Sequence, residues 1–273
     1  MTRYLKLYDW IDINKLNWNF LCSNPNAINL FEKNPDKINW DYIADNYNAI
    51  ELIKENLNKI NWNYLSNNIN AIELLKENPN NINWNYLSNN SNAIELLKEN
   101  PDKINWSYLS MNINAIEILK ENQNKIDWCK LSTNPNAIEL LQKNPNKIYW
   151  KSLSINYKGI ELLKENQNKI NWDYISLNSN AIDIIEHNLD KINWNLLTIN
   201  QNAIHILQKN QDKINWNLLS SNPAIFTYDY QEIKNKNHDL NDEIIKKALH
   251  PTRMLRLMNE YGEDEIYNCF FDD

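Results

Sequence analysis

Glycine is almost absent from this chain, since only Gly159 and Gly262 occur among its 273 residues. A loop that holds phosphate groups with backbone amides needs several glycines close together, so a nucleotide-binding loop of that kind is excluded. Cysteine is also scarce: Cys22, Cys129 and Cys269 are far apart, odd in number and in no CxxC spacing. They predict free thiols in a reducing compartment.

An excess of positive charge is missing as well. The formal net charge is −7, and no long basic run occurs. Because phosphate binding needs a local excess of Lys and Arg, nucleic acid and anionic membranes are not expected as partners. No stretch approaches the ~18 apolar residues of a membrane span, and residues 1–10 lack the apolar core of a signal peptide. We therefore expect a protein that is neither secreted nor transmembrane.

Tryptophan is abundant and strictly periodic. Ten tryptophans recur at intervals of 22 residues: Trp18, Trp40, Trp62, Trp84, Trp106, Trp128, Trp150, Trp172, Trp194 and Trp216. With Trp as the first residue, the usual unit is W-N-Y-L-S-x-N-x-N-A-I-E-L-L-K-E-N-P-x-K-I-N. Nine full units run from Trp18 to Asn215, and a tenth begins at Trp216 and slips by one residue at Ala224. Such a period is the signature of a repeat architecture.

Each unit has the pattern of two short helices. In the third unit, Asn61 is a good N-cap for a helix that starts at Trp62. Asn68 is suited to end that helix in the left-handed conformation, and Asn70 is placed to cap a second helix. In the second helix, residues 71, 72, 74 and 75 are apolar and share one half of the helical wheel, whereas 73, 76 and 77 are charged.

This spacing of three and four predicts an all-α protein without a sheet. A leucine-rich repeat would need alternating apolar residues, which are absent. One unit buries too little to fold alone, so the units must stack as an α-solenoid of about nine to ten two-helix repeats. At ~8–10 Å per unit the stack would extend ~80–100 Å. We expect an N-terminal cap over residues 1–17, the array over 18–224 and a C-terminal helical cap over 225–273, with helices near Asp242–Leu249 and Thr252–Tyr261.

The repeat resembles a known family. Giant DNA viruses of amoebae encode many proteins with 22-residue repeats of the type W-x-x-L-S-x-N-P-N-A-I-x-L-L-x-x-N-P-x-K-I, and Trp128–Ile148 is a close example. The likeness extends to flanking motifs: Asp9-Trp10-Ile11, Tyr228-Asp229-Tyr230, Glu243-Ile244-Ile245 and His250-Pro251-Thr252-Arg253. Several loop prolines of the family are replaced, as at Tyr47, Ile69 and Gln123. The resemblance implies a mimivirus-like viral protein, in the host cytoplasm or the virion, and implies no activity.

Four repeated features admit both a structural and a functional interpretation. The Asn columns from Asn24 to Asn222 and from Asn34 to Asn210 indicate helix termination and repeat-to-repeat hydrogen bonds, or else an amide ladder for a ligand. The Trp column indicates core packing rather than a stacking platform. The Glu and Lys columns, as at Glu73 and Lys76, are typical of a solvated helix face rather than of catalytic carboxylates. Histidines 187 and 205 should be exposed, and a metal site there is a remote alternative.

Departures from the repeat carry the candidate binding residues. Units six and seven contain Lys130 and Ser152 where Tyr is usual, and they also contain Tyr149, Tyr157, Lys158 and Gly159. These changes indicate either a kink or a local binding feature. The fifth residue after Trp is polar in the first four units, and later becomes apolar at Met111, Ile155, Leu177 and Ile199. An exposed apolar column can mark an interaction surface, although a short helix could also tuck these residues against the next unit.

The sequence therefore favours a non-enzymatic scaffold that binds an unidentified protein partner, with no cofactor, no metal and no catalytic residue to nominate. A structural protein that self-associates, for example in a virion, is the first alternative. A nucleic-acid reader built like the one-base-per-repeat helical proteins is the second, and the acidic net charge argues against it.

Overall fold

The computed structural model describes residues 4–236 together with Lys246 and Met254. Within these residues the protein is mainly helical, with two short helices in each of the nine full 22-residue units and one in the tenth unit. The prediction of an all-α repeat protein is confirmed. We number the units 1 to 10 from Trp18 to Trp216.

The first helix of each unit begins at the repeated Trp. These helices are α1 (Trp18–Cys22), α3 (Trp40–Ile43), α5 (Trp62–Asn67), α7 (Trp84–Asn89), α9 (Trp106–Met111), α11 (Trp128–Leu131), α13 (Trp150–Leu153), α15 (Trp172–Ile175), α17 (Trp194–Leu197) and α19 (Trp216–Leu219). The second helices are α2 (Ile28–Lys33), α4 (Ile50–Lys54), α6 (Ile72–Glu77), α8 (Ile94–Glu99), α10 (Ile116–Glu121), α12 (Ile138–Gln142), α14 (Ile160–Glu165), α16 (Ile182–Glu186) and α18 (Ile204–Lys209). Most units add a 3₁₀ turn after the second helix, as at Pro79–Asn81 (η5).

Local sequence explains both helices of a unit. Asn61 caps α5 as predicted, because its side chain accepts a hydrogen bond from the Asn63 amide. The core lies between the two helices, where Leu65 of α5 and Leu75 of α6 are fully buried. Glu and Lys on the far side of the second helix are exposed, and Lys76 pairs with Glu73 at 2.9 Å. The interpretation of these columns as a solvated helix face is confirmed.

Two predicted details of the Asn positions are wrong. Asn68 does not adopt the left-handed conformation, since its φ of −71° and ψ of 116° are extended. Asn70 does not cap the second helix, because Ala71 occupies the N-cap position without a side-chain hydrogen bond. The reason is that the Asn68 side chain accepts a hydrogen bond from the Asn70 amide, which turns the chain before the helix starts.

The buried Asn at the sixth residue after Trp joins each unit to the one before it. In unit 3, Asn68 Nδ2 donates to the carbonyl oxygens of Ala44 and Asn46 in unit 2, at 2.9 and 3.1 Å. All ten units repeat this pair of bonds, from Asn24 to Asn222. Both amide hydrogens are therefore used inside the protein, which confirms the structural interpretation of this column over a ligand ladder.

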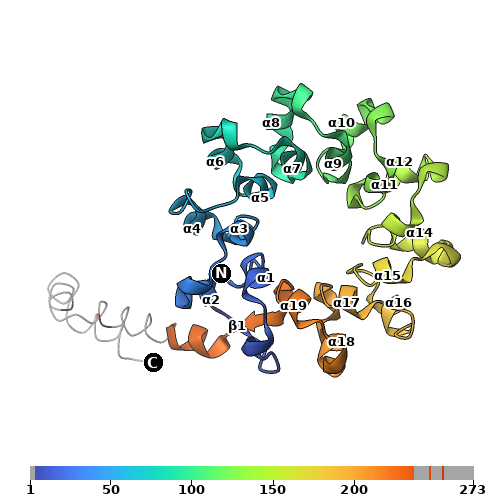
Figure 1. Cartoon of the computed structure of the whole chain (residues 1–273). Helices are drawn as coiled ribbons and strands as arrows, with labels where there is room; N and C mark the ends of the chain where they lie inside the picture. Colours follow the sequence, from blue (N-terminus) through green and yellow to red (C-terminus); the bar gives the residue numbers. More distant parts are fainter. Residues whose placement is uncertain (1–3, 237–245, 247–253, 255–273) are drawn as a thin grey trace. The chain divides into compact units, whose positions relative to one another are not determined.

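The same bonds close the array into a ring. Asn24 in unit 1 donates to Ser220 and Asn222 of unit 10 at 2.9 and 3.0 Å, as every other unit does to its predecessor. Asn17 and Asn26 also contact unit 10 through the bonds that their equivalents make elsewhere. Figure 1 shows the first helices on the inside of this ring and the second helices on the outside.

The N-terminal segment completes the tenth unit. Lys15-Leu16-Asn17 supplies the K-I-N end that unit 10 lacks, and Lys15 Nζ lies 4.8 Å from the centre of the Trp216 ring. Before it, strand β1 (Leu5–Leu7) pairs with strand β2 (Phe226–Tyr228) at the closure. The prediction of a protein without any sheet is wrong in this one place, where the second helix of unit 10 would otherwise begin.

The predicted extension to ~80–100 Å is also wrong, because this length is the circumference of the ring rather than its span. Figure 1 shows that the second helices are spread further apart than the first helices, so each unit is a wedge. Ten equal wedges accumulate into a closed circle. The ring unit runs from Thr2 to Thr227.

A separate unit begins at Tyr228. Residues 230–236 are helical, and the Asp229 side chain accepts a hydrogen bond from the Glu232 amide near the start of this helix. The helices predicted near Asp242–Leu249 and Thr252–Tyr261 lie outside the described residues, except for Lys246 and Met254.

Ring closure can be tested by comparing one substitution at two places. Asn112→Ala in the middle of the array removes both donors to two buried carbonyl groups, so we expect it to lower the free energy of unfolding by about 2–5 kcal/mol. In a closed ring Asn24→Ala should cost a similar amount. Urea denaturation measures both, with the exposed Asn124→Ala of the same unit as Asn112 as the control. A much smaller loss for Asn24→Ala would mean that the array is open in solution.

Candidate binding surface

Two positions in or directly after the first helix of each unit face the inside of the ring. These are the second and fifth residues after Trp, which we call position 2 and position 5. At ~100° per residue they lie opposite the buried third and fourth residues, and the second helices cover the other side (Figure 1). Positions 2 and 5 therefore form the inner face of the ring.

Aromatic side chains occupy position 2 in units 1 to 5. Neighbouring rings of Phe20, Tyr42, Tyr64, Tyr86 and Tyr108 are 6.4, 6.3, 6.3 and 6.0 Å apart between centroids. These spacings are shorter than the ~8–10 Å between packed helices, as expected on a concave side. Tyr42 and Tyr64 remain 40% and 38% exposed, so solvent reaches this face.

Position 5 contains the apolar column that the sequence singled out. Met111, Ile155 and Leu177 are half-buried, and Ile199 is 36% exposed. In the early units, polar side chains take the same place and bond to each other: Asn67 donates to Asp45 at 2.9 Å, and Asn89 donates to Asn67 at 3.2 Å. Position 5 therefore accepts either an amide ladder or an apolar stripe without a change of fold.

Charge is unevenly distributed around the inner face. In units 1 to 5 the first, second and fifth residues after Trp include Asp41 and Asp45 and no cation. Units 6 and 7 instead present Lys130 at position 2 and Lys151 at the residue before Ser152. Lys151 Nζ lies 4.9 Å from the centre of the Tyr174 ring in the next unit. The predicted residues Lys130 and Ser152 thus share a surface with the position 5 column.

The other predicted residues of unit 7 do not join this surface. Tyr149 precedes α13 and is 53% exposed, whereas Tyr157 follows the helix at its opposite end and is 41% exposed. Lys158 stands where the other full units of the repeat have Asn, and its Nζ donates to Asn136 Oδ1 at 2.7 Å. At Gly159 a Cβ would lie 2.8 Å from Leu153 Cδ1, so here the glycine makes room for a core side chain.

The Trp column belongs to the core side of the helices, as predicted. Each repeated Trp is half-buried against the core. In several units the lysine of the K-I-N motif covers the ring, as Lys125 does over Trp106 at 4.2 Å and Lys213 does over Trp194 at 4.4 Å. Such contacts contribute about 0.5–1 kcal/mol each when exposed. Among the described residues, lysines cover six of the ten repeated tryptophans in this way, and all ten pack against the core, so the column is not a free stacking platform.

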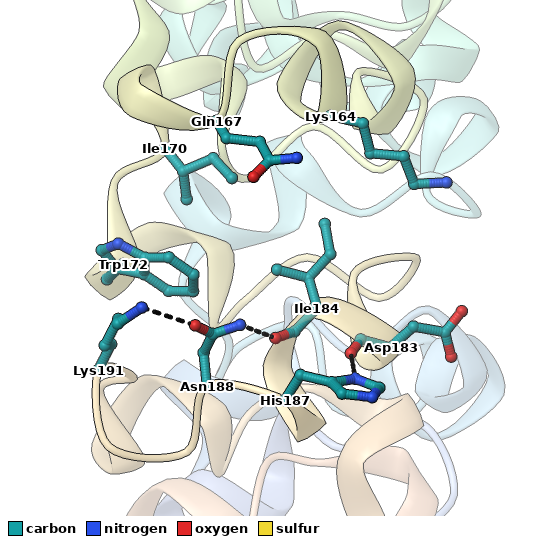
Figure 2. A pocket seen from close by; sticks show the side chains of 9 residues that line it. All are labelled: Lys164, Gln167, Ile170, Trp172, Asp183, Ile184, His187, Asn188 and Lys191. Atoms are coloured by element: carbon teal, nitrogen blue, oxygen red, sulfur yellow. Dashed lines mark hydrogen bonds between the residues drawn. The ribbon is translucent and has the colours of Figure 1, made fainter.

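The outside of the ring has a pocket that the sequence analysis missed. A cavity of about 570 Å³ lies between α14 and α16, and Trp172, Lys164 and His187 contribute to its lining (Figure 2). Its polar side chains have partners within the chain: Lys164 pairs with Glu161, Lys191 donates to Asn188, and the His187 ring contacts the Asp183 carbonyl.

The residue that begins the turn after the second helix is a sequence feature that could have indicated these pockets. Units 2 and 8 have Leu57 and Leu189 where other units have Pro or Gln, and in these two units no 3₁₀ helix follows. Both leucines pack against the core. The pocket beside α16 and another of about 380 Å³ between α2 and α4 lie next to these two units.

Titratable groups form no reactive cluster in the described part of the chain. Burial raises the pKa of the Cys22 thiol, which disfavours its reactive thiolate. His205 Nε2 lies 2.9 Å from Glu186 Oε1 on the exposed surface. Among the residues that the structure describes, no group of three or more His, Cys, Asp or Glu side chains is placed to hold a metal ion.

Comparison of the chain with protein-family models, curated proteins and solved structures finds no significant match. Over the described residues, no helix has both the length and the apolar character needed to cross a membrane.

Tyr149 offers a test of whether a departure from the repeat costs stability. It occupies the N-cap of α13 without a side-chain hydrogen bond, whereas Asn171 caps α15 by accepting from the Tyr174 amide. We expect Tyr149→Asn to raise the free energy of unfolding by about 0.5–2 kcal/mol, since it restores the cap. Asn171→Ala, the matched control, should lower it by a similar amount in urea denaturation. A Tyr149→Asn protein of lower stability would show that the tyrosine ring stabilises the fold.

Proposed function

We propose that this protein is a non-enzymatic scaffold that holds a segment of a partner protein against the inner face of its ring. The observation that carries the proposal is that different positions of each unit stabilise the fold and vary in sequence. The core and the inter-unit bonds use the Trp, Leu, Ser and Asn columns, and the partly exposed positions 2 and 5 vary from unit to unit. Variable residues on a rigid frame are where binding specificity resides in repeat proteins.

The chemistry of the inner face supports a protein partner. It combines tyrosines, aliphatic side chains and a few charges, and aromatic residues are enriched where proteins bind one another. Tyr86 and Ile199 represent the two kinds of side chain. A surface for nucleic acid would need a continuous series of cations, and in units 1 to 5 positions 2 and 5 contain no cation and one aspartate, Asp45.

On the resemblance of the repeat and its flanking motifs, we also propose that the protein is viral and acts in the host cytoplasm or the virion. The free cysteines support a reducing compartment, since Cys129 is exposed and unpaired. Self-association is the main competing function. It predicts that the molecular mass measured by light scattering rises with concentration, whereas a scaffold of the proposed kind should keep a constant mass.

The test uses a variant that copies residues already present in the fold. Leu177→Asn with Ile199→Asn gives units 8 and 9 the pair that units 3 and 4 have in Asn67 and Asn89, whose side chains are hydrogen-bonded at 3.2 Å. We call this protein the inner-face variant. We expect its free energy of unfolding to change by no more than about 1 kcal/mol, because the substituted position is half-buried or exposed.

Affinity capture from infected host cells should then separate the two faces. Proteins that bind the wild-type ring should be lost from the inner-face variant and kept by an outer-face control, Glu95→Ser with Lys98→Ser, which removes an exposed ion pair on α8. Mass spectrometry identifies the captured proteins. Equal capture by all three forms would refute the proposed role of the inner face.

A further inference from the structure

The inner face has two unlike sectors. The aromatic sector consists of the position 2 rings of units 1 to 5, from Phe20 to Tyr108, with Asp41 and Asp45 beside them. The aliphatic sector comes from units 7 to 10 and contains Ile155, Leu177, Leu196, Ile199 and Leu218. Positions 2 and 5 of units 8 to 10 contain no charged residue, and Asp173 lies at the residue after Trp172, as Asp41 does after Trp40.

Ring closure places these sectors opposite each other. In a closed ring of ten equal units, each unit faces the one five places further on, so unit 3 faces unit 8. The middle of the aromatic sector at Tyr64 therefore faces the aliphatic sector at Leu177 across the ring. An open stack would set the two sectors side by side along one surface, so this opposition depends on the closure bonds at Asn24.

The size of the ring limits what can lie between the sectors. Ten helices spaced ~8–10 Å apart give ~25–32 Å between opposite helix axes. Helices with side chains are ~10–12 Å in diameter, which leaves ~13–22 Å across the middle. One α-helix of ~10–12 Å fits this width. A partner segment that follows the circle of units is disfavoured, because neighbouring position 2 rings are only 6.0 to 6.4 Å apart and the space per unit decreases further toward the centre.

On the basis of the proposed function, we propose that the partner segment is a single amphipathic α-helix with an apolar stripe and a basic opposite face, held in the middle of the ring. Its apolar stripe contacts the aliphatic sector. Such a stripe covers at least ~100° of a helix, and the aliphatic sector spans four of the ten units. Its lysines or arginines contact the aromatic sector, where Asp45 supplies negative charge.

The ring already contains an example of the polar contact. Lys151 Nζ lies 4.9 Å from the centre of the Tyr174 ring, also at position 2. In the described residues, no lysine or arginine lies over the rings of Tyr42, Tyr64, Tyr86 or Tyr108. The rings contact one another but stay partly exposed, as at Tyr42 and Tyr64, so a cation from a partner can reach them and cation–π attraction adds to the charge of Asp45. An acidic or neutral helix would lack both contributions.

Binding of designed peptides tests this inference. The probe is a fluorescent Leu/Lys peptide of about 18 residues with leucines at i, i+3, i+4 and i+7, so that one helical face is apolar. We expect saturable binding to the wild-type ring by fluorescence anisotropy. A scrambled peptide of the same composition, and a Leu/Glu peptide with the same stripe, should each bind at least about tenfold more weakly.

Variants then locate the peptide. The inner-face variant and Tyr64→Ser with Tyr86→Ser, which copies Ser152 of unit 7, should each weaken binding at least about tenfold. The outer-face control should bind as the wild type does. Equal binding of the scrambled peptide, or equal binding by the inner-face variant, would overturn the inference, because either result means general attraction to an acidic protein.

Two further results separate this inference from the function on which it rests. If the inner-face variant loses its captured host or viral proteins but the Leu/Lys peptide does not bind the wild type, the amphipathic helix is wrong and the scaffold function stands. If neither capture nor peptide binding depends on the inner face, both are wrong. Direct binding of a labelled single-stranded oligonucleotide to the wild-type ring at low salt, lost in the inner-face variant, would also overturn the inference in favour of a nucleic-acid partner.

Discussion

The structure depends above all on one buried amide. In every unit the Asn at the sixth residue after Trp donates both amide hydrogens to carbonyl groups of the preceding unit and accepts a backbone hydrogen bond within its own. Its side chain replaces the backbone pairing that a sheet would provide between neighbouring segments. Within the described residues, no buried side-chain nitrogen or oxygen lacks a hydrogen-bond partner, as a stable core requires. Since these bonds fix how one unit sits on the last, they also fix the curvature of the array.

Curvature determines where function can reside. Because the units are wedges and close after ten, the first helices turn their variable positions toward a shared centre. Side chains that are distant in sequence, such as Tyr64 and Leu177, then belong to one surface. The outer helices carry regular ion pairs such as Lys98 with Glu95 at 2.9 Å, which contribute little individually in solvent. Variation on the inside and regularity on the outside together favour the inner face as the binding surface.

The closure also gives the segments on either side of the array a structural role. Lys15-Leu16-Asn17 matches the K-I-N end of a repeat, and in the structure it finishes unit 10 from the other end of the chain. The contact of Trp10 with Trp216, at 6.5 Å between ring centroids, and the pairing of β1 with β2 reinforce the same junction. While the junction between units 1 and 10 is intact, the ring is expected to unfold cooperatively as a whole. The stability of the protein therefore depends on the closure of the ring.

The sequence by itself determined the period, the two helices of each unit, the N-caps such as Asn61 and the buried face with Leu65 and Leu75. These features follow from local rules, because caps and apolar spacing act over a few residues. It also identified the position 5 column, since a column that changes character is visible in any aligned repeat. It misjudged Asn68 and Asn70, because a side chain bonded to a neighbouring unit overrides the local preference for a left-handed turn. Only the tertiary structure decided that the array closes, that Lys15 covers the Trp216 ring and that Tyr64 faces Leu177 across the ring of units. Closure is the sum of ten small rotations between units, and each rotation is set by inter-unit hydrogen bonds and packing that no single repeat contains.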